Sequence, residues 1–259
     1  MGKLLRFNLR KLVMQKSAYI CLAIILGLCL IYAVAYKLMM DSNPSSPEIS
    51  LTQQIIASRT GGLAYWLFSL MSSNFTMVFG IAVAIIVCED FDQRTIKNII
   101  ARGYSATQLY FSKLIIVFIA VTVAFAVTEV AAFAISSAFF GVPRGDIAKA
   151  FGLIMLQYLG VLANTSFVFA ISYIIKRMGF SIATVIISQL IIQLLLLLAD
   201  TLINSKDIAL SDYWIDTYLQ KVCFISASEK DIAICLFGSI AYIAGFVLLG
   251  ALFRKKKEI

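Results

Sequence analysis

The sequence contains no histidine, which excludes any catalytic triad, proton relay or metal site that relies on imidazole. Its five cysteines form no C-x-x-C pair, and their odd number argues against a disulfide framework or a zinc site. Nor does the chain contain the G-x-x-x-x-G-K-[ST] phosphate loop with which many proteins bind ATP. The chemistry that these groups support is therefore not expected of this chain.

Charge is also scarce: 14% of the 259 residues are charged and 61% are hydrophobic, with a mean hydropathy of +0.93. A soluble domain of this length is about a quarter charged and could not bury so much apolar surface. The composition therefore predicts an all-α integral membrane protein. The net charge of +8 suits anionic headgroups and a positive inner side better than nucleic acid, so we expect no nucleic-acid partner.

Six apolar runs have about the length of a membrane span. They cover roughly 17–39, 64–87, 114–140, 151–175, 179–199 and 232–253. The first run is longer than a signal-peptide core, so we interpret it as a retained span. The three prolines, Pro44, Pro47 and Pro143, all fall between runs. We expect six transmembrane helices in one domain, 1–259.

Most lysines and arginines flank the runs on one side, which includes both chain ends and predicts cytoplasmic termini. Residues 3–16 place Leu5, Leu9 and Leu12 on one helical face and basic residues on another. This pattern indicates an interfacial helix resting on membrane lipid, although an ordinary positive flank fits as well.

Two of the loops are expected on the outer side of the membrane. The first, 41–62, opens with turn-forming residues and should begin without helix. The second, 200–231, is long and carries Tyr213, Trp214 and Tyr218, residues typical of the membrane interface. We expect one or two short helices at the outer leaflet there; the alternative is a solvated loop.

A charged block, 89–108, interrupts the apolar pattern with the features of a cytoplasmic helical hairpin. Three acids, Glu89, Asp90 and Asp92, suggest a helix start, with Asp90 placed to pair with Arg94. Gly103 is a good helix stop, and the Ser105–Gln108 segment matches a capping box that starts the next helix, which runs through Lys113 into the third span.

The first helix of this hairpin has an apolar face, formed by Ile96, Ile99 and Ile100. Such a face requires a partner. The residues leave two alternatives open: another protein, or the headgroups and span ends of the chain itself.

The stretch "EDFDQRTIKNIIARGYSATQLYFSKLI" resembles the loop between spans two and three in permease subunits of type-2 ABC exporters. Glu89, Thr95, Ile96, Gly103 and Lys113 match that pattern in order. The departures are Arg94, where the family usually has glycine, and Ala106-Thr107, where a basic residue is common.

The resemblance implies that two such permease subunits form the pathway and that separate ABC ATP-binding subunits drive it. ATP and Mg would be held by that partner, and no cofactor by this chain. The hairpin would couple to the ATPase, with the interfacial helix as a second contact. The implied coupling residues are Glu89, Asp92, Arg94, Thr95, Ile96 and Gly103.

Small permeases of this size resemble those that export antimicrobial and other amphipathic peptides, or confer immunity to them, in Gram-positive bacteria. The resemblance therefore implies a multi-pass protein of the bacterial cell membrane and a peptide substrate.

Several polar residues fall within the expected spans. Glu129 lies in the third, where an ionisable group is costly and is a candidate for the substrate pathway. The alternative is a carboxyl that braces Gln157, Asn164 or another span. Further pathway candidates are Asn164 in "NTS" and the pair Gln189 and Gln193; the alternative for these is helix-to-helix hydrogen bonding.

Two other function classes remain. An ion-driven secondary transporter of a hydrophobic or cationic compound fits six spans, but such proteins often have interrupted helices and several buried ionisable groups. A membrane enzyme has few candidate groups without histidine. We expect a transport subunit rather than an enzyme.

Overall fold

All regular elements in the described part of the chain are helices. The computed structural model describes residues 2–41, 61–68, 73–93, 95–101, 103–141, 146–203, 210–223 and 227–255. The helices are α1 (Gly2–Met14), α2 (Lys16–Asp41), α4 (Gly61–Phe68), α5 (Ser73–Asp92), α6 (Thr95–Ala101), α7 (Ala106–Phe140), α8 (Ile147–Ile175), α9 (Met178–Ile203), the 3-10 helix η1 (Leu210–Tyr213), α10 (Ile215–Val222) and α11 (Glu229–Lys255).

Five of these helices, α2, α7, α8, α9 and α11, are long and apolar enough to cross a membrane. They correspond to five of the six expected runs. The sixth run, 64–87, is described as α4 and α5, and residues 69–72 between them lie outside the described part. Its prediction as one continuous span therefore stays a prediction.

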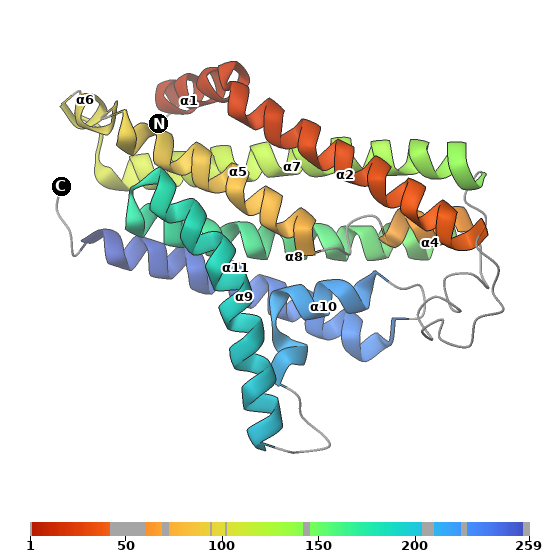
Figure 1. Cartoon of the computed structure of the whole chain (residues 1–259). Coiled ribbons are helices and arrows are strands. Elements are labelled where there is room, and N and C mark those ends of the chain that lie inside the picture. The colour runs from red at the N-terminus through yellow and green to blue at the C-terminus, as the bar shows by residue number, and fades with distance from the viewer. Residues whose placement is uncertain are drawn as a thin grey trace.

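The bundle has two distinct ends (Figure 1). One end, here called the α6 end, carries α1, α6 and the C-terminal end of α11. The opposite end, here called the α10 end, carries α4 and α10. The expected cytoplasmic position of both termini stays a prediction.

Helix α8 occupies the centre of the bundle. In its most apolar stretch 72% of the residues are buried, compared with 11% in α9 and in α11. Gly80 of α5 permits close approach here, because an added Cβ would lie 2.9 Å from Val185 of α9 and 3.3 Å from Val168 of α8. The inner core is thus formed where α5, α8 and α9 meet.

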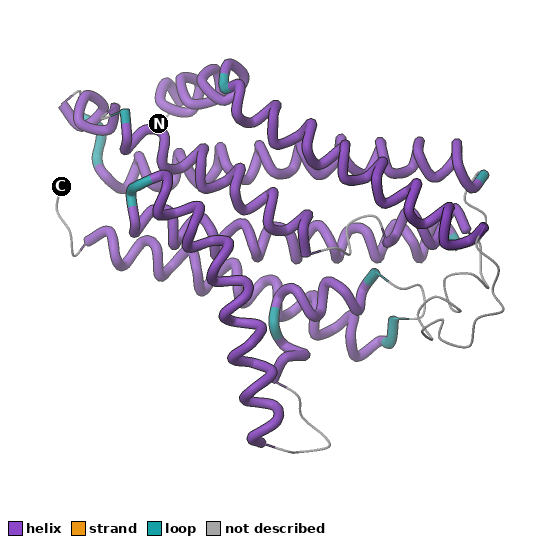
Figure 2. The backbone as a smooth tube through the Cα atoms, viewed as in Figure 1, coloured by secondary structure: helices purple, strands orange, loops and turns teal. Residues whose placement is uncertain are grey.

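Helix α9 leaves the bundle along its length (Figures 1 and 2). Its first half contacts α5 and α8, and Gln189 is buried there. Beyond this point Gln193 is exposed, together with large apolar residues including Leu194, Leu195 and Leu198. Gln189 and Gln193 therefore lie in different surroundings, although their spacing places them on one helical face.

The expected loops are described in part. Of the first outer loop, 41–62, residues 42–60 lie outside the described part, and residues 61–62 begin α4. The long loop, 200–231, contains η1 and α10, as predicted. Asp200 near the end of α9 caps η1 by accepting hydrogen bonds from the backbone N–H groups of Leu210 and Ser211, at 2.6 and 3.2 Å.

Candidate functional site

The charged block forms a helical turn at the α6 end. α5 continues to Asp92, α6 follows, and Gly103 takes a positive φ of 84°, a conformation in which glycine avoids the steric cost of a side chain. Ser105 then caps α7 in a complete capping box with Gln108. The predicted stop and restart are both confirmed.

The sequence pattern indicated that the three acids begin a helix, but in the structure they do not. They lie at the C-terminal end of α5, where the helix dipole disfavours negative charge. Glu89 and Asp90 are stabilised by lysines of other helices, and Asp92 by a backbone N–H at the start of α9. The expected partner of Asp90, Arg94, lies outside the described residues, so that pairing stays a prediction.

Asp90 is 1% exposed and pairs with two lysines from two helices. Its Oδ1 lies 2.5 Å from Nζ of Lys11 on α1, and its Oδ2 pairs with Nζ of Lys113 on α7. Lys113 also donates to the carbonyl oxygen of Ile86 at 3.0 Å. Burial raises the pKa of Asp90, but the neighbouring ammonium groups of Lys113 and Lys11 outweigh it, so the pKa lies below its ordinary value. Asp90 is thus an ionised link between α1, α5 and α7.

The next two residues bind the turn between α8 and α9. The ring of Phe91 packs edge-on against Tyr173 of α8, with centroids 5.4 Å apart, and Nζ of Lys176 lies 5.7 Å from the Phe91 centroid. Asp92 Oδ2 accepts a hydrogen bond from the backbone N–H of Met178, the first residue of α9, at 3.2 Å. The segment 89–92 is therefore a junction, here called the α5 junction, that contacts α1, α7, α8 and α9.

Two of the three residues of the apolar face of α6 pack within the chain, and the side chain of Ile100 lies outside the described part. Ile96 and Ile99 form a cluster with Leu4 of α1 and Leu109 of α7, and each of the four is less than 7% exposed. Of the two alternatives left by the sequence, the structure supports packing on the chain's own helices. Ile96 is consequently a brace of α6 rather than a surface residue.

Helix α1 turns polar residues toward the bundle. Asn8 donates to Ser112 Oγ of α7 at 3.0 Å, next to the Lys11 contact with Asp90. The exposed side carries Phe7, Val13 and Met14, whereas the face predicted to be apolar, with Leu5, Leu9 and Leu12, is half-buried. The predicted helix is present but its faces are assigned differently, and its position on lipid stays a prediction.

The other coupling candidates lie around the same turn. Glu89 is half-buried, 3.8 Å from Lys11, and Thr95 is half-buried at the start of α6. Asp92 and Gly103 are exposed. The structure thus brings the candidates together at the α6 end, and their contact with an ATPase stays a prediction.

Glu129 is buried in α7 and its carboxyl faces α4. It is 8% exposed, and the indole of Trp66 interacts with it. Neither carboxyl oxygen has a hydrogen bond of good geometry among the described residues. The alternative partners named from the sequence are engaged elsewhere: Gln157 donates to Leu67 O at 3.2 Å, and Asn164 donates to Thr76 O at 3.3 Å.

Asn164 therefore joins α8 to α5, as the helix-bonding alternative predicts. The hydroxyl groups of its neighbours Thr165 and Ser166 donate to backbone carbonyl oxygens of their own helix, at 2.8 and 2.9 Å. A role of Asn164 and Gln189 in a substrate pathway stays a prediction.

A family model described as "ABC-2 family transporter protein" matches residues 4–195, about three quarters of the chain. The chain belongs to this family. It is therefore the membrane-spanning subunit of an ABC transporter, and the family implies a separate ATP-binding partner. No match was found among curated proteins or among solved structures.

For this ABC-2 subunit, sequence reasoning missed the partners of Asp90. Lys113 carried a signal, because it lies at the edge of a long apolar run where a lysine is costly without an acid. The position of Lys11 gave no signal of an acidic partner beyond the positive charge of its side chain. Trp66 beside Glu129 and the buried carboxyl of Asp216 were also missed, since neither spacing nor composition indicates which helices meet.

Proposed function

We propose that this subunit forms half of the translocation pathway of an ATP-driven exporter in a bacterial cell membrane. A second permease subunit, identical or related, completes the pathway. Energy comes from a separate ABC ATP-binding subunit that holds ATP and Mg. Membership of the ABC-2 family supports the coarse role, and the missing phosphate loop supports the division of labour.

The α6 end is the proposed docking site of the ATPase and faces the inside of the cell. The observation that carries this assignment is the bracing of α6: Ile96 and Ile99 are held against α1 and α7. A seven-residue helix is too short to be stable alone, so bracing lets it transmit force. The outward side offers exposed positions at Gln93, Ala101 and Gly103.

Movement of α6 reaches the spans through the α5 junction. Asp90 connects to α1 and α7, and Asp92 connects to the first residue of α9. Glu89 and Asp92 thus act in coupling by holding the chain's own helices, with Arg94, Thr95 and Gly103 nearer to the partner. Helix α1 contributes a second contact and rests on membrane lipid through Phe7, Val13 and Met14.

The proposed substrate is an amphipathic, cationic peptide. Support comes from the resemblance of small permeases to peptide export and immunity systems, and from Glu129, a buried carboxyl whose oxygens lack good partners among the described residues. In this proposal Glu129, Asn164, Gln189 and Gln193 line or support the path. Glu129→Gln would lower export of a cationic peptide while leaving ATPase assembly intact.

Co-purification tests the proposal first. The permease is tagged and isolated from cells that express it with the ATP-binding subunit encoded beside it. We expect a stable complex, and transport that stops when the Walker lysine of the ATPase is replaced. Transport that survives this replacement would exclude the ATP-driven role.

One observation favours the second candidate, an ion-driven secondary transporter. Glu129 is a carboxyl buried within the long apolar helix α7, and buried ionisable groups are common in that class. The two functions separate in proteoliposomes that contain the permease alone. Uptake driven by a proton gradient without ATP would support the secondary transporter.

A further inference from the structure

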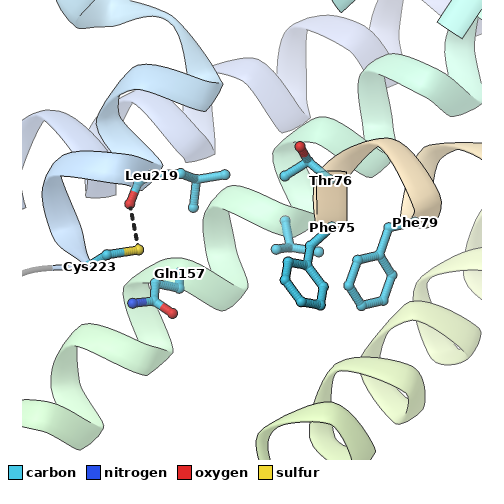
Figure 3. A pocket seen from close by; sticks show the side chains of 7 residues that line it. Phe75, Thr76, Phe79, Gln157, Leu219 and Cys223 are labelled. Carbon is cyan, nitrogen blue, oxygen red and sulfur yellow. Dashed lines mark hydrogen bonds between the residues drawn. The ribbon is translucent and has the colours of Figure 1, made fainter. Parts of the chain in front are cut away.

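Helix α10 is seated at the α10 end of the bundle, with Ile215, Tyr218, Leu219 and Val222 buried along one helical face. Leu219 fits against Gly160 of α8, where an added Cβ would lie 2.4 Å from Leu219 Cδ2. Leu219 also lines a small cavity that has room for about one water-sized group (Figure 3). This cavity is too small for a larger ligand, so α10 meets the inner bundle in close packing.

A larger groove lies on the surface between η1 and α11. Its volume is about 560 Å³, within the range of about 300–1,000 Å³ that is usual for ligand sites. Tyr213 comes from η1, and the rest of the lining comes from α11: Ala233, Ile234, Phe237, Gly238, Ala241 and Tyr242. Three of these residues are small, which leaves a hollow between the larger side chains. The lining is apolar apart from the two tyrosine hydroxyl groups.

Tyr242 fixes the shape of this groove. Its hydroxyl donates to the carbonyl oxygen of Tyr213 at 3.1 Å, which ties α11 to η1. Its ring stacks on Phe246 with centroids 5.7 Å apart, and meets the ring of Trp214 edge-on at 5.9 Å. The groove is therefore a preformed feature of the α10 end, with its aromatic side held by three contacts.

The dimensions of the groove match a lipid acyl chain. From Ala233 to Tyr242 the lining advances nine positions along α11, which is about 14 Å at about 1.5 Å per residue. Helix α11 is long and apolar enough to cross a membrane, and half of a hydrocarbon core about 30 Å thick is about 15 Å. A helix about 10–12 Å wide needs about 400–600 Å³ for a single turn, so the groove does not accommodate a helix of a second copy.

The charges at one end of the groove match a lipid headgroup. The first turn of α11 contains Glu229 and Lys230, both exposed, and the groove begins one turn later. Lys230 precedes Ala233 by three positions and Ile234 by four, so it lies on the groove side of the helix. Its ammonium group suits a phosphate, and the carboxylate of Glu229, four positions before Ala233, suits the amine of a zwitterionic headgroup.

We propose that this groove binds one acyl chain of a zwitterionic phospholipid, with the headgroup at Glu229 and Lys230. The bound chain fills the space between Tyr213 and α11, and so holds η1 and the adjoining α10 against the last span. The site requires only that α11 crosses the bilayer, so it does not depend on the exporter role.

Tryptophan quenching gives a direct test, because the chain has only two tryptophans and Trp214 contacts Tyr242 of the groove. The Trp66→Phe permease, in which Trp214 alone emits, is placed in nanodiscs that contain phosphatidylethanolamine with brominated or ordinary chains. We expect the brominated lipid to quench Trp214. Ala241→Phe places a ring in the groove and should abolish most of this quenching.

Ala244→Phe is the matched control. It makes the same substitution at another exposed alanine of α11, which does not line the groove. Its quenching should equal that of the parent. Equal quenching in Ala241→Phe and Ala244→Phe would overturn the proposal.

Native mass spectrometry of the detergent-purified permease identifies the occupant by its mass. We expect a phospholipid retained on the wild type and on Ala244→Phe, lost in Ala241→Phe, and reduced in Lys230→Gln. The last change lies at an exposed position, so it decides the matter if Ala241→Phe fails to fold. Wild-type retention in Lys230→Gln and Ala241→Phe would overturn the proposal. A retained peptide in place of the phospholipid, or a dimer lost in Ala241→Phe with its lipid unchanged, would also overturn it.

Discussion

At the scale of single residues, Asp90 is the carboxylate on which the α6 end depends. It is almost fully buried and holds the ammonium groups of Lys11 and Lys113. Asp90→Asn leaves Lys113 buried without its counter-charge, which commonly costs about 3–5 kcal/mol. We expect a clear fall in the melting temperature of the purified permease, measured by thermal denaturation in nanodiscs.

The control is Asp212→Asn, which breaks the more exposed pair with Lys221 and should cost less than about 1 kcal/mol. Because the pKa of Asp90 is lowered, its stabilising charge is present above the ordinary aspartate range and is lost only as pH falls through the lowered pKa. Equal melting temperatures for wild type and Asp90→Asn at pH 7 would contradict this role.

For Asp216 we predict that stability depends on pH in the opposite direction. Burial raises its pKa, against hydrogen bonds with Trp214 and Thr76 that lower it. The packed position of α10 favours the neutral form of Asp216. The packing of α10 against the bundle therefore becomes less stable as pH rises from the ordinary aspartate pKa toward the raised pKa of Asp216. In Trp66→Phe, the emission of Trp214 should shift to longer wavelength over that range.

Other titratable groups lie near Asp216. On α10, burial raises the pKa of Tyr218 and Cys223 above their ordinary values, so both stay neutral through the same range. Tyr242 of α11 contacts Trp214, and Glu129 of α7 lies toward Cys223. The shift should therefore be absent in Asp216→Asn; a shift of the same size in that variant would assign it to another group.

At the scale of elements, the fit of α10 against α8 is set by one glycine. Gly160→Ala forces Leu219 to move, and overpacking of this kind costs about 1–3 kcal/mol. Leu219→Ala alone leaves a cavity, with a cost of about 2–5 kcal/mol. Combined, the new methyl group occupies part of that cavity, so the double variant should be no less stable than Leu219→Ala. Strictly additive losses in thermal denaturation would show that the two side chains do not meet.

The turn between α6 and α7 also depends on one glycine. Gly103→Val places a β-branched residue at φ 84°, at a cost of about 1–3 kcal/mol. We expect membrane insertion to persist while ATP hydrolysis no longer supports transport. Gly103→Asn is the matched control, because asparagine tolerates positive φ and should retain most coupling. Normal coupling in Gly103→Val would refute the importance of this turn.

Charge reversal in the α5 junction is expected to have the same effect as Gly103→Val. Glu89→Lys repels Lys11, and Asp92→Lys removes the cap from the first residue of α9. Each variant should insert normally and hydrolyse ATP without matching transport. The measurement is the ratio of transport to ATP hydrolysis in proteoliposomes; an unchanged ratio in both would separate the junction from coupling.

The elements were predictable where apolar length decides them. Five helices follow the apolar runs, and the Ser105 cap follows from local hydrogen bonding. The prediction of 64–87 as one span is not tested, because residues 69–72 between α4 and α5 lie outside the described part. The inward face of α1 was missed, and the partner of the α6 face was left as two alternatives, since periodicity defines a face but not its partner.

At the scale of the whole molecule, the two ends of the bundle have different chemistry. The α6 end is held by ion pairs around Asp90, and the α10 end by a seated helix above a small cavity. The contacts of Lys11 with Asp90 and of Asp92 with Met178 join residues 79 and 86 positions apart, which a single sequence cannot show. Between the ends, α9 exposes a leucine-rich surface.

The central claim is that hydrolysis in an ATP-binding partner drives this subunit. The direct measurement is export of a cationic peptide into inverted vesicles that contain the permease and its ATPase. The account predicts uptake that requires ATP, stops when the Walker lysine is replaced, and falls in Gly103→Val with hydrolysis retained. Uptake that proceeds without ATP, or with the inactive ATPase, would contradict it.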